Sequence, residues 1–499
     1  MAEQTHWIPG GPQTHFLSTS LRLVNEKSKT RFTNALTPVL MTLHRLKSRI
    51  DDMDHQSIWD EFKKITNPYE FVFLSLAKRM QYSVARKIPL SRSYYKMVEI
   101  WQSLGFINDI PAEFTTAHSA EGPGGFIEAC VDIAKKTGRN LKYSLAMTLR
   151  STDKNIPGWK KSQTFLHDNP KVEITYGLDG TGNLYNCKNH EVFRKLFAEK
   201  GDEEGADLYT ADGGFDFTND FDNQEENVIQ LLVSEILLGL TVLKKGGILI
   251  VKLFDTVLQP TIELLYLTTR QFREWTIIKP RTSRAANSER YLVCKAYLGK
   301  DENILNLLEL AVKQTESIVS FLDPEMHRQQ EYIEFQKKIM EFSQILSELQ
   351  IIAIKRTLHV IENKTSEILR GEIKENILRS LEWCQTHDIE INRYYQENTM
   401  EFLLEKLSVE LLTSNFGSSS HQQGLFPSRK YPRGHFQLRP TPDVVSASLP
   451  PSSPSELSSA PVQPCQSSEQ EAWQTAEETR SGNWETVKRP QRRNWKGEP

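Results

Sequence analysis

The chain has 499 residues, of which 38% are hydrophobic and 25% charged, values that are ordinary for a soluble globular protein with room for roughly two to four domains. Its formal net charge of −3 excludes a global basic surface for nucleic acid, so any such surface must be a local patch. The N-terminus lacks the basic and apolar regions of a signal peptide, and no apolar run approaches the ~18 residues that span a bilayer, which predicts an intracellular protein without a membrane segment.

Residues 1–105 are predicted to form an N-terminal helical region after an irregular, Gly/Pro-rich start of about 15 residues. Beyond that start, apolar residues recur at the spacing of amphipathic helices, as they do in Phe32, Leu36, Val39, Leu40 and Leu43. Breaks near residues 51–54, 67–68 and 88–89 divide the region into about four helices.

Residues 106–300 show a different pattern, in which short apolar runs alternate with longer helical segments. The predicted strands are 114–117, 143–149, 172–176, 207–211, 248–253, 275–278 and 291–298. Predicted helices at about 126–136 and 224–243 are followed by glycines, which commonly end helices. The alternation indicates an α/β fold with a mostly parallel, doubly wound sheet, and the missing helix before the last strand predicts that this strand is a reversed edge strand.

The stretch 114–130, FTTAHSAEGPGGFIEAC, is typical of a strand, a tight turn and the start of a helix. Its glycines allow backbone amides to approach a ligand, and the helix directs unpaired N–H groups toward it. The GPGG spacing differs from the G-x-G-x-x-G that binds a pyrophosphate, Pro123 removes one donor, and Glu121 would repel phosphates. A ligand with hydroxyls, an ammonium or a sulfonium fits better, and S-adenosylmethionine is such a ligand. A plain structural turn is an equally good interpretation of this stretch alone.

Residues 301–414 return to a helical pattern and predict a C-terminal helical domain, whose role is open between binding a protein partner and packing against the sheet. From 415 to 499 the composition changes to Ser, Pro, Gln and Gly, which cannot bury enough apolar area to offset chain entropy, so this tail is predicted to be disordered. The tail ends in VKRPQRRNWKG, a basic cluster that suits RNA, an acidic partner or a merely solubilising role.

Four residues stand out by type and position. Asp212 follows a buried-strand pattern, so its carboxylate is expected at the edge where open α/β sheets bind ligands. Lys252 ends an apolar strand, Glu289 precedes the last strand, and Lys96 lies on a helix upstream of the sheet. Taken singly, each has a plain structural interpretation, such as a snorkelling lysine or a turn carboxylate. The five cysteines show no C-x-x-C pair and no histidine at ligand spacing, which predicts reduced thiols and no metal site.

Together these four residues resemble the Lys-Asp-Lys-Glu tetrad of the FtsJ-like ribose 2′-O-methyltransferases, in the order Lys96 (SRSYYKMVEI), Asp212 (YTADGG), Lys252 (ILIVKLFD) and Glu289 (NSERYLV). Within that family the chain is most similar to cap-specific mRNA 2′-O-methyltransferases and their relatives in large DNA viruses. AEGPGGFIEA resembles the C-E-x-P-G-G/A-F loop of this branch, and GLDGTGNLY resembles its G-x-D-G-T-G-D/N element. The resemblance covers roughly residues 80–300.

The resemblance implies a Rossmann-like methyltransferase sheet of seven strands with the last one reversed, flanked by the two helical regions. It implies S-adenosylmethionine as the cofactor and RNA, here capped mRNA, as the substrate, with the tetrad as the catalytic residues. The implied cofactor-binding residues are Glu121, Gly122, Pro123, Gly124, Gly125, Phe126, Asp179 and Asp212. It also implies an intracellular site of action, in the cytoplasm or nucleus, or in the host cytoplasm if the source is viral.

The sequence departs from the family pattern near the cofactor. His118 stands where many members have an acidic residue at the end of the first strand, which leaves Glu121 as the candidate partner of the methionine ammonium. Ala120 replaces a common cysteine, and only Asp153, some way past the second strand, is available for the cofactor ribose.

Methyl transfer from a sulfonium is an in-line displacement, so positioning contributes much of the catalysis. Lys252 is expected to act as a base or a hydroxyl-steering group, and Asp212 and Glu289 to hold the two lysines, with Asp212 also favouring the sulfonium methyl electrostatically. A free lysine titrates near ~10.4; burial and the cation Lys96 would lower the pKa of Lys252 toward ~7–8, whereas neighbouring carboxylates would raise it. The sequence leaves open which effect is larger.

Three other functions fit parts of the sequence. A methyltransferase fold kept as a non-catalytic RNA-binding or scaffold protein would suit the helical flanks and the tail, but it has no need for the four tetrad residues. An NAD-dependent enzyme would need the missing G-x-G-x-x-G. Methylation of rRNA in place of the mRNA cap is the third, and the cap-type loop favours mRNA.

Overall fold

The structure of the protein is a computed structural model that describes residues 7–10, 19–24, 37–51, 56–74, 82–151, 156, 158–214, 224–314, 317–395 and 400–413. The predicted tail, 415–499, and Asp153 lie outside the described residues. No described helix combines the length and the apolar character needed to cross a membrane.

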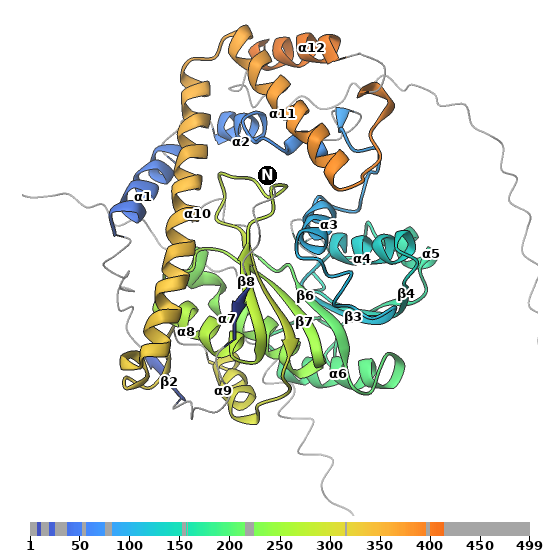
Figure 1. Ribbon diagram of the computed structural model, residues 1–499, viewed down its shortest axis with the longest axis vertical. Coiled ribbons are helices and arrows are strands. Elements are labelled where there is room, and N and C mark those ends of the chain that lie inside the picture. Colours follow the sequence, from blue (N-terminus) through green and yellow to red (C-terminus); the bar gives the residue numbers. More distant parts are fainter. Residues whose placement is uncertain are drawn as a thin grey trace, which may run out of the picture. The chain divides into compact units, whose positions relative to one another are not determined.

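A mixed sheet of eight strands has the order β1-β8-β9-β7-β6-β3-β4-β5 (Figure 1). Its strands are β1 (Ile8–Pro9), β3 (Glu113–Ser119), β4 (Asn140–Met147), β5 (Val172–Thr175), β6 (Ala206–Ala211), β7 (Leu243–Leu253), β8 (Phe272–Ile278) and β9 (Arg290–Tyr297). The neighbours from β5 to β7 pair in parallel, whereas β9 is antiparallel to both β7 and β8. The predicted α/β sheet with a reversed last strand is confirmed.

Three details of strand pairing differ from the prediction. The reversed strand β9 does not lie at an edge, because the β8–β9 loop, residues 279–289, lets it insert between β7 and β8. The strand β1, within the start that was expected to be irregular, pairs with β8 at that edge. A separate two-stranded sheet joins β2 (Thr19–Val24) to β10 (Ser317–Leu322), and both segments lie in regions predicted to be helical. Pairing between segments so far apart leaves no trace in local periodicity.

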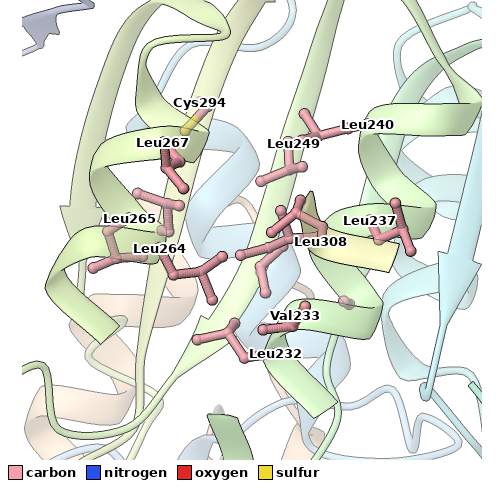
Figure 2. Packing of buried hydrophobic residues seen from close by; sticks show 14 of the residues in the cluster. Leu232, Val233, Leu237, Leu240, Leu249, Leu264, Leu265, Leu267, Cys294 and Leu308 are labelled. Carbon is pink, nitrogen blue, oxygen red and sulfur yellow. The ribbon is translucent and has the colours of Figure 1, made fainter. Parts of the chain in front are cut away.

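Helices cover both faces of the main sheet, so the strands bury apolar side chains on both sides. In β7, Leu249 and Val251 belong to one core and Ile248 and Ile250 to the other, as strand alternation requires. The first core also contains residues of the helices α6 (Cys187–Lys200), α7 (Gln224–Val242), α8 (Gln259–Thr269) and α9 (Glu302–Val312). Figure 2 shows leucines of α7 and α8 packed near Leu249 in this core. The second core contains residues of α3 (Ser93–Ser103) and α4 (Gly125–Lys136).

The remaining helices include α1 (Thr37–Asp51), α2 (Gln56–Ile65), η2 (Glu70–Val72), α5 (Gln163–Asp168), η4 (Met326–Arg328), α10 (Gln330–Glu362), α11 (Ser366–Thr386), η5 (Arg393–Tyr395) and α12 (Met400–Thr413). The N-terminal helices α1 and α2 contact α10, and α11 contacts η2 and α12 (Figure 1). Leu43 and Leu46 of α1 share a small core with Ile354 and Leu358 of α10. The N-terminal and C-terminal helical regions therefore pack against each other.

Candidate active site

The structure brings Lys96, Asp212, Lys252 and Glu289 together at the carboxyl ends of the central strands. Lys96 projects from α3, Asp212 follows β6, Lys252 lies near the end of β7, and Glu289 directly precedes β9. The Nζ atom of Lys96 lies 2.8 Å from Oε1 of Glu289, and the Nζ atom of Lys252 lies 3.3 Å from Oδ1 of Asp212. Lys252 also donates a 2.6 Å hydrogen bond to the backbone oxygen of Asp212. All four side chains are only 10–14% exposed, so the cluster consists of two largely buried ion pairs.

Tyr291 connects these two ion pairs, and the sequence reasoning missed it. Its hydroxyl donates to Oδ1 of Asp212 at 2.8 Å and accepts from Nζ of Lys96 at 3.5 Å. Burial and the nearby carboxylates of Asp212 and Glu289 hold the pKa of Tyr291 well above its usual value, so the phenol keeps its proton. A signal was present in the sequence, because Tyr291 lies two residues after Glu289, at the predicted start of the last strand.

The charge state of Lys252, which the sequence left open, is decided by its carboxylate neighbours. Burial acts to lower the pKa of Lys252, but the charges of Asp212, Glu289 and Glu235 outweigh it and raise the pKa above its usual value. Burial likewise acts to raise the pKa of Glu289, but Lys96 and Lys252 hold it well below its usual value. Lys252 is therefore an ammonium in the free protein, and of the two opposing effects that the sequence left open, that of the carboxylates is the larger.

Glu235 is a second residue that sequence reasoning missed, because on α7 it looks like one polar position in an apolar helix. It is 2% exposed, and it accepts a hydrogen bond from the backbone N–H of Gly213, directly after Asp212. With Lys252 it lines a cavity of about 10 Å³. Burial and the charge of Asp212 raise the pKa of Glu235 to about 8, although Lys252 opposes this shift.

We expect Glu235→Gln to stabilise the protein increasingly as the pH rises from about 5 to about 8. In this range folded Glu235 keeps its proton whereas unfolded Glu235 loses it, so the group lowers the free energy of unfolding of the wild type by about 1.4 kcal/mol per pH unit. Glutamine does not ionise, so the free energy of unfolding of the variant does not decrease with pH through this position. Urea unfolding of both proteins between pH 5 and 9 measures the difference, and a difference that does not change with pH would contradict the prediction.

The glycine-rich loop joins β3 to α4 and holds α4 directly against α3. Gly124 has a φ of +100°, and a Cβ atom on Gly125 would lie 2.2 Å from Oγ of Ser93 and 2.4 Å from Oγ of Ser91. Gly125 therefore permits close packing against the first turn of the helix that carries Lys96. Phe126 is fully buried, and its ring lies 5.7 Å from the ring of Tyr291, so the loop is packed against the tetrad cluster.

Glu121 and His118 face each other where the sequence departs from the family pattern. Nδ1 of buried His118 lies 3.2 Å from Oε2 of Glu121, and Thr210 donates a hydrogen bond to Oε1 of Glu121. Burial raises the pKa of Glu121, although His118 opposes the shift. Among the described residues, buried Oε2 of Glu121 makes no well-aligned hydrogen bond, so His118 holds it through the 3.2 Å contact. The carboxylate thus lies three positions later in the chain than the acidic residue of the family pattern, and its contact with a methionine ammonium stays a prediction.

The turn at 177–185 lies beside this loop, because it packs on the end of the neighbouring strand β4. A Cβ atom on Gly182 would come within 2.1 Å of the backbone oxygen of Thr148, so only glycine allows this approach. Asp179 accepts hydrogen bonds from the backbone and hydroxyl of Thr181 and from the side-chain amides of Asn186 and Asn189. Burial opposes them, but these bonds lower the pKa of Asp179 to about 2. Asp179 thus holds the turn, and its contact with an adenine amino group stays a prediction.

Residues 89–297 match the model of the family described as FtsJ-like methyltransferase. A protein of Dictyostelium discoideum is 29% identical over 333 residues, covering 62% of this chain and 41% of that protein. A protein of Trypanosoma cruzi is 33% identical over 219 residues, covering 42% of this chain and 57% of that protein. A protein of Mus musculus is 30% identical over 269 residues, covering 52% of this chain and 31% of that protein. All three are named cap-specific mRNA (nucleoside-2′-O-)-methyltransferase 1.

The chain spans about half the length of the curated relatives it matches, with shares between 31% and 57% for those above. Among solved structures, a ribosomal RNA methyltransferase of Plasmodium falciparum aligns with a TM-score of 0.30 at 18% identity, covering 42% of this chain and all of that one.

Proposed function

We propose that this chain, whose residues 89–297 form an FtsJ-like methyltransferase domain, is an S-adenosylmethionine-dependent RNA 2′-O-methyltransferase that acts on the cap-proximal nucleotides of mRNA. The observation that carries the proposal is the convergence of Lys96, Asp212, Lys252 and Glu289 into two buried ion pairs beside the glycine-rich loop. A scaffold protein has no use for two lysines and two carboxylates placed so closely in a largely buried site, where each charge is costly to desolvate.

The cofactor-binding part of the proposal rests on the loop and turn at the ends of β3 and β4. The residues proposed to hold S-adenosylmethionine are Glu121, Gly122, Pro123, Gly124, Gly125, Phe126, Asp179 and Asp212. The carboxylate of Glu121 suits the methionine ammonium, and the carboxylate of Asp212 suits the positive sulfonium. When bound, S-adenosylmethionine supplies a methyl group activated by the sulfonium charge.

Lys252 is proposed to act on the hydroxyl that receives the methyl group. Its Nζ atom is held by two oxygens of Asp212, so it has a fixed direction and one remaining hydrogen-bonding position for a substrate hydroxyl. Asp212 and Glu289 hold the lysines, and Tyr291 joins the two pairs into one connected network. The four residues are therefore pre-positioned before any substrate binds, which suits a displacement reaction.

A cavity of about 160 Å³, lined in part by Ser288, the residue before Glu289, supports a nucleic-acid substrate. The residues that line it are Lys47, Ile50, Trp59, Lys63, Gln224, Arg284, Ala286, Asn287, Ser288, Gln350 and Ile354. Cations bind phosphates, and an indole ring stacks on bases, so this lining suits a nucleotide. Each of these cations has an acidic partner, since Lys47 pairs with Asp255 at 3.6 Å, Lys63 with Asp60 at 2.5 Å and Arg284 with Glu70 at 2.8 Å. The cavity is formed partly by α1, α2 and α10, outside the domain that matches the family model.

The test is mass spectrometry of RNA after incubation with the full chain and S-adenosylmethionine. We expect one methyl group on the ribose 2′-oxygen of a cap-proximal nucleotide, because the 2′-hydroxyl is the group that distinguishes RNA from DNA. Uncapped RNA should be a poorer substrate, and the matching DNA oligomer should stay unmodified. Equal methylation of uncapped RNA would point to an rRNA-type substrate, and RNA binding without transfer would point to a scaffold protein.

The site of action and any protein partner belong to the same proposal. Capped RNA occurs in both the nucleus and the cytoplasm, so action on mRNA fits either compartment. A protein partner of the C-terminal helices stays a prediction.

A further inference from the structure

The loop between β8 and β9, residues 279–289, carries Glu289 at its end and forms one wall of the cavity. Its conformation is fixed by groups from elements far from it in sequence. Glu70 of η2 accepts from the guanidinium of Arg284, and Gln350 of α10 donates to the backbone oxygen of Ala286 at 3.1 Å. Both η2 and α10 lie outside residues 89–297.

Glu99 makes three hydrogen bonds with this loop. It lies on α3, one turn after Lys96, and is 5% exposed. Its carboxylate accepts from the backbone N–H of Arg281 at 2.6 Å, and from the backbone N–H and hydroxyl of Thr282 at 3.1 and 3.0 Å. A fourth hydrogen bond comes from the indole Nε1 of Trp383 on α11, at 3.1 Å. One carboxylate thus joins the helix of Lys96, the loop of Glu289 and a C-terminal helix.

We propose that Glu99 is a positioning residue for the Lys96–Glu289 pair and that Trp383 holds Glu99 in place, so that the C-terminal helices complete the active site. The inference rests on the proposed methyltransferase function and assigns the C-terminal helical region a role within it. Lys96 and Glu99 are on the same helix, so a movement of α3 relative to the loop breaks the contacts of both residues together.

The energetics of a buried carboxylate make this connection strong. Burial raises the pKa of Glu99, and the hydrogen bonds from Arg281, Thr282 and Trp383 oppose that shift by stabilising the charge. Loss of one donor leaves a buried carboxylate oxygen partly unsatisfied. This costs more free energy than the loss of an exposed hydrogen bond, because water cannot replace the donor. The carboxylate can relax only by turning toward other donors, and this would release the loop.

The experiment compares Trp383→Phe with Trp101→Phe in the full chain. The first substitution removes the N–H donor but keeps an aromatic ring. Trp101 is a buried tryptophan on α3, and its Nε1 has no hydrogen-bond partner among the residues the structure describes, so it is a matched control. We expect faster amide hydrogen exchange in the 279–289 loop for Trp383→Phe and unchanged exchange for Trp101→Phe. In the methyl-transfer assay, kcat should fall about tenfold for Trp383→Phe, while the Kd for S-adenosylmethionine stays within about twofold.

Thr282→Val provides a second variant should Trp383→Phe not fold, because it removes the hydroxyl donor to Glu99 from the loop side. The same increase in loop exchange is expected. Unchanged loop exchange in the folded variants, or an equal fall in kcat for Trp101→Phe, would overturn the inference. A wild-type chain inactive on every RNA would overturn the proposed function instead, and hydrogen exchange would still show whether Trp383 holds the loop.

Discussion

Replacing Lys252 with alanine is expected to reduce methyl transfer to capped RNA by about 10³-fold or more, while the Kd for S-adenosylmethionine stays within about twofold. The Nζ atom of Lys252 is fixed by the backbone and side chain of Asp212, so its removal deletes the group that meets the acceptor hydroxyl. Apart from Asp212, the proposed cofactor contacts lie on other elements, in the loop after β3 and the turn after β5. Single-turnover transfer and isothermal titration with the cofactor measure the two quantities separately.

Lys244→Ala is a matched control for this variant. Lys244 lies at the opposite end of the same strand, where its Nζ atom is 2.8 Å from Oδ1 of Asp207, so the substitution removes a paired lysine from β7 without touching the tetrad. Transfer by the Lys244 variant should stay close to that of the wild type. Turnover by the Lys252 variant within a few-fold of the wild type would remove Lys252 from the mechanism.

The rate of methyl transfer is expected to rise about tenfold per pH unit between pH 7 and 9, or about 100-fold in total. Asp212, Glu289 and Glu235 outweigh burial and raise the pKa of Lys252, so the amine that can accept a proton is a minor species at neutral pH. Each pH unit below the raised pKa then increases the amine about tenfold. Single-turnover rates at saturating cofactor and RNA, with fluorescence to confirm that the protein stays folded, measure this dependence.

Glu235→Gln tests the physical cause of this pH dependence. Glu235 raises the pKa of Lys252 only when it is ionised, above about pH 8, so in this range the rate of the variant should exceed that of the wild type. A flat profile in the wild type would show that Lys252 acts as a cation that orients the hydroxyl, and that its proton does not leave before transfer. An unshifted profile in the variant would show that Glu235 has no influence on Lys252.

Much of the sheet and the membership of the tetrad cluster could be predicted from the sequence. Each of the seven predicted strands corresponds to a strand in the structure, because apolar runs between helix-period segments are a local signal. Alternation along β7 also placed Lys252 on the same side as Ile248 and Ile250. Lys96, Asp212, Lys252 and Glu289 were recognised from residue types, their order and a family resemblance, and the structure brings all four together; their catalytic roles stay predictions.

Only the tertiary structure decided which groups surround these four residues. Tyr291, Glu235 and the Glu99–Trp383 contact depend on side chains that meet across different elements, and nothing in local spacing records such meetings. The pairing of β2 with β10 was hidden for the same reason.

The charge on Lys252 shows this division most clearly. The sequence determined that a lysine ends a buried strand close to carboxylates, and therefore that two opposing effects act on its pKa. Their balance depends on distances and burial, because Coulomb energies change with separation and with the local dielectric. Those quantities exist only once the chain has folded, and here they favour the ammonium.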